Sequence, residues 1–302
     1  MNLSGVVVAA LTPLTSDGIS LADERVFAAY YDFLLQYPIA GLFVNGTTGE
    51  GMALTLQERM EVARRAVRLA YGRAPVLVHA GFTSTAETTF LASQAVECGA
   101  DGVVIIAPYF YPYDRQSLIE HFCAAAQAAH GRPVYLYHLP SYTGNPIDAE
   151  ILTAVRQACP NVCGIKFSDS DLAQLQEIQR VGGTEFNVLS GDDSLVLPGL
   201  ALGTDGCVSG KSSVFPDMLQ AILSAFREAR LEEARRAQAL LIELGNRLDQ
   251  WPGMELACFK YALLRRGVDI GGVRRPHRPL NSAERERLDQ DFAEMRALGV
   301  LF

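Results

Sequence analysis

The sequence is poor in lysine, has few cysteines, and contains neither a long apolar run nor an excess of basic charge. Only three of its 26 basic residues are lysines, and 34 acidic residues give a net charge of −8. An isoelectric point near 5.2 leaves no basic footprint for nucleic acid. No apolar run approaches the roughly 18 residues that span a membrane. With 49% apolar residues, the 302-residue chain is long enough to bury a large core, which excludes a disordered protein.

The six cysteines are scattered, and only Cys159 and Cys163 are close in sequence. No histidine or second cysteine pair completes a zinc spacing, so we expect reduced thiols, no metal, no cofactor and a cytoplasmic location. The first eleven residues lack the basic flank of a secretory signal, and Thr12-Pro13 follows them in place of a cleavage site. We interpret them as a first strand.

Short apolar runs alternate with longer amphipathic stretches over the first three quarters of the chain. The runs are rich in Val and Ile, as is typical of strands buried on both faces. They are Gly5–Leu11, Gly41–Asn45, Pro75–Ala80, Gly102–Ala107, Pro133–His138, Val162–Phe167, Phe186–Ser190 and Gly206–Ser209. Eight strand–helix units predict an α/β protein with a (β/α)8 TIM barrel. A doubly wound sheet is the alternative, but Leu11–Thr15 is not the glycine-rich phosphate turn that it needs.

Three further helical stretches follow the eight units. They cover Leu231–Leu248, Met254–Arg266 and Ser282–Leu298. We therefore expect a catalytic barrel over residues 1–229 and a C-terminal three-helix extension over residues 230–302. Within the barrel, Thr55 and Glu58 have the spacing of a capping box at a helix start.

The chemically unusual residues follow the predicted strands, where the functional groups of such barrels gather. Lys166 is the last residue but one of the sixth strand, in an apolar run where a charged ammonium is costly. Burial favours the free amine, which can attack a ketone or aldehyde to form a Schiff base, whereas arginine cannot. The alternative is a structural lysine paired with Asp169. We expect Lys211 to be a surface or anion-binding charge, and Lys260 to be solvated on a helix.

Other side chains are expected at the same end of the barrel. Tyr137, on the preceding strand, could act there as general acid and base, or could simply be a packed aromatic. The turn Gly46-Thr47-Thr48-Gly49 could hold a carboxylate through hydroxyls and amides, or be an ordinary turn. Phe110 lies in an aromatic run that could form a wall, Asp193 could bind hydroxyls or cap a helix, and His138 should point to the opposite face from Tyr137.

Taken together, these motifs resemble the dihydrodipicolinate synthase / N-acetylneuraminate lyase superfamily over nearly the whole chain. The matching segments are Gly46-Thr47-Thr48-Gly49-Glu50, Tyr137-x-x-Pro140, Gly164-Ile165-Lys166 and Gly191-Asp192-Asp193. The resemblance implies a (β/α)8 barrel, commonly a homotetramer, with class I chemistry on pyruvate. By the same carry-over, Lys166 is the Schiff-base lysine and Tyr137 the acid–base residue. Thr47 and Thr48 hold the pyruvate carboxylate, with Gly191 and Val208 contributing backbone groups.

Two departures from the synthase pattern point toward the lyase branch. Such synthases usually place an arginine two residues after the Tyr-x-x-Pro proline to bind aspartate semialdehyde, and here that residue is Tyr142. They usually have a tyrosine, lent across a subunit interface, where this chain has Phe110. The segment from Gly164 through Ser168 to Leu172 resembles the sialic-acid lyases, although their sugar-binding Asp-Glu pair is replaced here by Asp193-Ser194.

We therefore expect a pyruvate-dependent lyase (an aldolase) that cleaves or forms a 4-hydroxy-2-oxo acid. N-acetylneuraminate and 2-keto-3-deoxy sugar acids are the candidate substrates. Tyr142, Ser168, Asp193 and Phe110 are the residues expected around the substrate tail. The alternatives are a dihydrodipicolinate synthase, a keto-deoxy sugar acid dehydratase, and a non-catalytic binder. No nucleic acid or membrane partner is expected.

Overall fold

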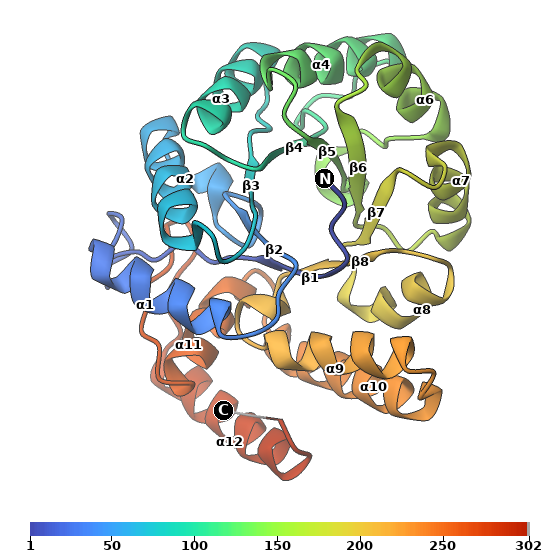
Figure 1. Ribbon diagram of the computed structural model, residues 1–302. Coiled ribbons are helices and arrows are strands. Elements are labelled where there is room, and N and C mark those ends of the chain that lie inside the picture. The colour runs from blue at the N-terminus through green and yellow to red at the C-terminus, as the bar shows by residue number, and fades with distance from the viewer. Residues whose placement is uncertain (301–302) are drawn as a thin grey trace.

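The computed structural model describes residues 1–300 and has a closed barrel of eight parallel strands in sequential order (Figure 1). The strands are β1 Gly5–Ala9, β2 Gly41–Val44, β3 Val76–His79, β4 Gly102–Ile106, β5 Val134–His138, β6 Val162–Phe167, β7 Asn187–Ser190 and β8 Gly206–Ser209. Each falls within an apolar run of the sequence. The predicted (β/α)8 barrel is therefore confirmed, and the doubly wound alternative is wrong.

Helices surround the barrel and connect successive strands (Figure 1). They are α1 Glu24–Leu35, α2 Leu56–Ala70, α3 Thr85–Glu97, α4 Arg115–Ala128, α6 Ala149–Ala158, α7 Leu172–Gly182, α8 Val196–Ala201 and α9 Pro216–Arg227. The capping box at the start of α2 forms as the spacing predicts, because Thr55 and Glu58 bond each other's backbone N–H. A 3-10 turn, Asp193–Leu195, directly precedes α8.

Alternate residues of the strands fill the barrel interior, because successive side chains of a strand point to opposite faces. The inner set is Leu3, Val7, Ala9, Phe43, Leu77, Val104, Ile106, Tyr135, Tyr137, Leu189 and Val208. The N-terminal segment closes one end. There Leu3 exchanges backbone hydrogen bonds with the Asn187 side chain, and the Tyr135 hydroxyl donates to the Asn187 Oδ1 at 2.8 Å.

The C-terminal extension has the three expected helices, α10 Leu231–Leu248, α11 Glu255–Arg265 and α12 Ser282–Ala297. In Figure 1, α10 lies alongside α9, and α11 and α12 lie beneath the side of the barrel where β1 is found. The segment before α12 packs closely on the loop after β1. A Cβ on Gly271 would lie 1.9 Å from the Leu14 carbonyl oxygen, so only glycine fits there.

Three findings concern residues 1–300 as a whole. No helix in this range is long and apolar enough to cross a membrane. The same residues contain no cluster of three or more His, Cys, Asp or Glu side chains that could hold a metal ion. The six cysteines are all free thiols.

Candidate active site

Lys166 and Tyr137 lie side by side at the carboxyl ends of β6 and β5. The two residues are register partners of a parallel strand pair, so both side chains point into the barrel. The Lys166 Nζ lies 4.2 Å from the centre of the Tyr137 ring and 5.2 Å from that of Phe43. Lys166 is only 7% exposed. Among residues 1–300, no carboxylate forms an ion pair with its ammonium group.

The structural alternative for Lys166 was a pair with Asp169, but that carboxylate lies beside another residue. The Asp169 Oδ2 is 3.5 Å from the Nε2 of His138. His138 points out of the barrel, as expected, where it stacks on Phe167 and accepts a hydrogen bond from the Ile147 N–H. Lys166 is thus a buried amine without an acidic partner in the described chain.

Gly191, at the end of β7, leaves room for the lysine side chain. A Cβ at this position would lie 2.9 Å from the Lys166 Cε and 1.9 Å from the Ser168 Oγ. Any larger residue would therefore collide with both side chains. The Ser168 hydroxyl oxygen is buried without a hydrogen-bond partner in the described residues. Val208 on β8 belongs to the apolar filling of the barrel below this point.

The Thr47–Thr48 turn faces the same centre from the end of β2. The Thr47 hydroxyl lies 3.5 Å from the Tyr137 hydroxyl, a distance at which either group could donate. Thr47 is exposed and Thr48 half-buried, so both remain open to a ligand. The structure thus brings Lys166, Tyr137, Thr47 and Gly191 to one end of the barrel.

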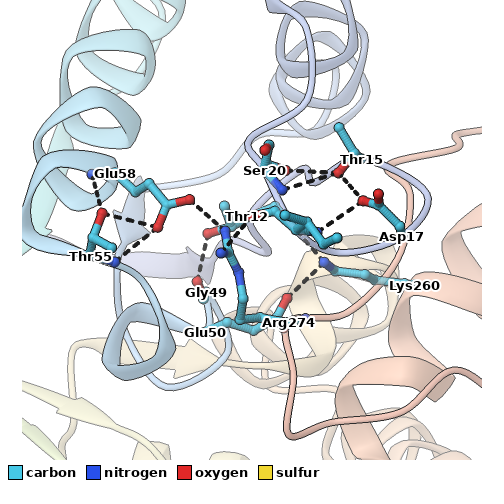
Figure 2. Close-up of polar contacts among 11 residues, drawn as sticks. Thr12, Thr15, Asp17, Ser20, Gly49, Glu50, Thr55, Glu58, Lys260 and Arg274 are labelled. Atoms are coloured by element: carbon cyan, nitrogen blue, oxygen red, sulfur yellow. Dashed lines mark hydrogen bonds and ion pairs between the residues drawn. The ribbon is translucent and has the colours of Figure 1, made fainter.

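The expectation that Lys260 is solvated is wrong. Its Nζ lies 2.7 Å from the Glu50 Oε1, and both side chains are almost fully buried. The same ammonium donates to the carbonyl oxygens of Thr12 at 2.9 Å (Figure 2) and Gly272 at 2.5 Å, so one carboxylate and two carbonyl groups surround it. Burial lowers the pKa of Lys260, and the Glu50 carboxylate opposes that shift.

Glu50 ends the turn that carries Thr47 and Thr48, and the extension holds it from two sides. Besides Lys260 of α11, the backbone N–H of Arg274 donates to the Glu50 Oε2 at 2.6 Å (Figure 2). The Thr12 hydroxyl donates to the neighbouring Gly49 carbonyl at 2.6 Å. The C-terminal extension therefore fixes the turn that faces Tyr137.

The expectation for Lys211 also needs correction, because this lysine is buried, at 7% exposure. Its Nζ lies 3.3 Å from the Asp193 Oδ2 and 3.4 Å from the Asp249 Oδ2. Burial alone would lower the pKa of Lys211, but the two carboxylates outweigh it and raise the pKa. Lys211 is thus neutralised by two acids, one of which comes from the extension.

Two cavities open beside the Lys166–Tyr137 centre. One, of about 390 Å³, is rich in hydroxyl and carboxylate groups; its lining includes Ser141, Ser168, Asp192, Asp193, Lys211 and Asp249. The other, of about 330 Å³, is mainly apolar and is lined by Thr47, Met52, His79, Ile106, Tyr109, Tyr142 and Thr143. Tyr142 lies in a short helix, α5 (Pro140–Thr143), which was not predicted, and it borders both cavities.

Phe110 does not reach this centre within the chain. It lies on the loop after β4, 81% exposed, with a left-handed backbone (φ 84°). Its ring packs edge-on against Tyr111, with centroids 4.9 Å apart. The structure therefore leaves Phe110 on the surface, apart from Lys166.

Known proteins resemble this chain over nearly its whole length. A family model described as the Dihydrodipicolinate synthetase family matches residues 2–295. The chain belongs to this family. A 4-hydroxy-tetrahydrodipicolinate synthase of Sorangium cellulosum is 35% identical over 297 residues, which cover 98% of this chain and 97% of that protein.

Two solved structures of the family's fold are equally similar to the chain. YagE, a prophage protein of E. coli K12 in complex with pyruvate, has a TM-score of 0.91 and 28% identity, over 97% of this chain and 98% of that one. Proteus mirabilis N-acetylneuraminate lyase has a TM-score of 0.91 and 28% identity, over the full length of both chains. Both branches of the resemblance are thus represented, and the chain is an enzyme of the class I aldolase type, a lyase.

Three residues in or beside this candidate site had no role in the predictions from sequence. His79 is the one titratable residue of the third apolar run and stands at its carboxyl end, so its position could have revealed it. Glu50 is part of the matching segment, but its partner Lys260 is distant in sequence. Asp249 lies at the end of a helix of the extension, and no local signal connects it with Lys211.

Proposed function

We propose that this protein is a pyruvate-dependent aldolase that cleaves or forms a 4-hydroxy-2-oxo acid with a hydroxylated tail, such as N-acetylneuraminate or a 2-keto-3-deoxy sugar acid. The observation that supports this proposal is a cavity rich in hydroxyl and carboxylate groups. It lies beside the buried Lys166, which has no acidic partner in the described chain. Carboxylates accept hydrogen bonds from the hydroxyls of a polyol. A negatively charged tail would meet Asp192, Asp193 and Asp249, with Lys211 already paired.

In the direction of cleavage, the Lys166 amine adds to the C2 carbonyl of the oxo acid, and water leaves as the imine forms. Tyr137 takes the proton of the C4 hydroxyl while the C3–C4 bond breaks. The electron pair of that bond moves into the protonated imine to give an enamine, and the aldehyde leaves. Protonation at C3 and addition of water then release pyruvate and restore the amine.

The remaining site residues have binding roles in this proposal. Thr47 and Thr48 hold the carboxylate of pyruvate, helped by backbone groups near Gly191 and Val208. Ser168, Tyr142 and Asp193 contact the tail of the second substrate. Phe110 would reach substrate only across an interface between subunits. We also propose a homotetramer, which the family resemblance implies and which light scattering of the purified protein would test. A cytoplasmic location belongs to the same proposal.

A 4-hydroxy-tetrahydrodipicolinate synthase is the second candidate, because a relative of that name is 35% identical over nearly the whole chain. This reaction needs recognition of the carboxylate of aspartate semialdehyde. A phenol such as Tyr142 does not replace a bidentate guanidinium for that purpose. We therefore favour the aldolase.

The test is a direct comparison of the two reactions. Pyruvate release from N-acetylneuraminate and 2-keto-3-deoxygluconate is measured with lactate dehydrogenase, beside condensation of pyruvate with aspartate semialdehyde. We expect cleavage of at least one sugar acid, lost in Lys166→Arg, and no appreciable condensation. Faster condensation than cleavage would contradict the proposal, and loss of water without pyruvate release would identify a dehydratase.

A further inference from the structure

His79 has one ring nitrogen fixed by an arginine that has no acidic partner. Arg59 of α2 is 1% exposed and forms no ion pair among residues 1–300. Its guanidinium donates to the carbonyl oxygens of Gly81 and His79, at 3.2 and 2.7 Å, and lies 3.3 Å from the His79 Nδ1. A guanidinium can only donate, so Nδ1 must accept. The proton of the neutral ring is then on Nε2.

The ring is also kept neutral. Burial, the Arg59 charge and the Lys166 charge all lower the pKa of His79 well below its ordinary value, with a smaller opposing effect from the backbone of Asn45. A neutral imidazole with Nδ1 accepting has one N–H, at Nε2, and cannot act as an acid near neutral pH. It can, however, polarise a carbonyl as a hydrogen-bond donor.

That N–H has no hydrogen-bond partner in residues 1–300, although His79 is only 3% exposed. Burial of a donor without a partner is unfavourable, so its presence needs a reason. The Nε2 edge faces the carboxyl end of β3, since a Cβ on Gly81 would lie 3.1 Å from it. Here the imidazole borders the apolar cavity that Thr47 also lines.

The imidazole ring is also close to the reacting groups. The His79 ring packs edge-on against Tyr137, with centroids 6.2 Å apart, and against Phe43 at 5.9 Å. Lys166 lies over the same two rings, and the Thr47 hydroxyl is 3.5 Å from that of Tyr137. The Tyr137 ring therefore packs on the His79 ring, and its hydroxyl lies near Thr47, which lines the same cavity as His79.

We propose that the His79 Nε2–H is a hydrogen-bond donor to the substrate oxygen that Tyr137 protonates and deprotonates, with Arg59 as the residue that positions it. This inference rests on the proposed aldolase function. In synthesis, the N–H polarises the aldehyde carbonyl and stabilises the alkoxide until Tyr137 protonates it. In cleavage, it stabilises the same oxygen as its proton leaves. A preorganised donor of this kind typically contributes about 10²- to 10³-fold in rate.

The test separates the pyruvate half-reaction from carbon–carbon bond formation. His79→Phe keeps an aromatic ring and removes the donor, whereas His79→Gln keeps a donor N–H. The probes are borohydride trapping of the pyruvate imine, deuterium exchange at the pyruvate methyl group, and condensation of pyruvate with glyceraldehyde, erythrose or arabinose. His138→Phe is the matched control, because His138 is a buried histidine at the end of β5 that points out of the barrel.

For His79→Phe we expect trapping and exchange at the wild-type level, with condensation about 10²-fold slower. His79→Gln should recover a large part of that loss, and His138→Phe should show no selective loss of condensation. Wild-type condensation in a folded His79→Phe, or equal losses in all three measurements, would overturn the inference. Failure of the wild type to form an imine or to condense would instead contradict the proposed function itself.

Discussion

The mouth of the barrel and the seam between barrel and extension both bury lysines, but they treat them differently. Lys166 meets aromatic rings and no carboxylate in the described chain. Lys260 meets Glu50, and Lys211 meets Asp193 and Asp249. Burial alone therefore does not distinguish a nucleophile from a structural cation. The distinguishing feature is the missing acid, because each paired ammonium is tied to a carboxylate whereas Lys166 has none beside it in the described chain.

Replacing the unpaired lysine should have the largest effect on chemistry and the smallest on stability. Lys166→Met removes the nucleophile, so imine formation and turnover should be abolished. Because no acid loses its partner, the free energy of unfolding should stay the same or rise by up to about 1 kcal/mol. Urea unfolding beside the aldolase assay measures both. A strongly destabilised Lys166→Met would mean that this lysine has an acidic partner after all.

Replacing Lys260, which is paired with Glu50, should affect stability more than chemistry. Lys260→Met leaves the Glu50 carboxylate buried and unpaired, which should cost about 3–5 kcal/mol of unfolding free energy. It should also raise the KM for pyruvate more than it lowers kcat, since Glu50 fixes the Thr47–Thr48 turn.

Two further variants test the pairing. The double change Lys260→Met with Glu50→Leu removes both charges and should restore most of the stability. Arg266→Met is a matched control at the same seam, because Arg266 pairs with Asp217, away from the turn. It should lower stability without a selective change in the pyruvate KM. If Lys260→Met and Arg266→Met changed the KM for pyruvate equally, Glu50 would not be the residue that fixes the Thr47–Thr48 turn.

A buried histidine without an acidic partner should make the stability of the protein depend on pH. Burial lowers the pKa of His121 to about 4, and its Nε2 has no partner among the described residues. The unfolded chain takes up this proton near pH 6.5 while the folded one does so only near the lower value. Stability is therefore lost as the pH falls through that window, by about 3 kcal/mol for this residue. Urea titrations of wild type and His121→Gln should show a flatter pH dependence in the variant.

Of the two paired lysines, Lys211 should contribute less to stability than Lys260. Its partner Asp249 is about half exposed, so water can solvate that carboxylate once the lysine is gone. We expect Lys211→Met to cost about 1–2 kcal/mol, within the range for losing a hydrogen-bonded charge. It should change the KM of the sugar acid and leave the pyruvate KM unaltered. If Lys211→Met lowered the free energy of unfolding as much as Lys260→Met, the solvent exposure of Asp249 would not explain the size of the effect.

Sequence could predict the parts of this molecule that depend on local pattern. Strands such as Val162–Phe167 are buried on both faces and so appear as continuous apolar runs, and strand order follows from the alternation with helices. Lys166 and Tyr137 could be predicted because each lies near the carboxyl end of such a run. The three helices of the extension begin and end within one residue of their predicted bounds.

Sequence could not predict contacts made between distant segments. Lys260 occupies a helix of mixed polarity, and only folding reveals that Glu50, Thr12 and Gly272 converge on it. Lys211 is surrounded by Gly and Ser in sequence, so its burial against α10 has no local sign. His79 stands at a strand end like Lys166. Its fixed tautomer, however, depends on Arg59 of another element.

The most direct test of the account is reduction with borohydride in the presence of pyruvate, read by intact mass and peptide mapping. The chain has three lysines, all buried, so the map decides among them. We predict one reduced pyruvate adduct, on Lys166, and none in Lys166→Met. An adduct on Lys211 or Lys260, or no adduct on the folded protein, would contradict the claim that the unpaired lysine is the nucleophile.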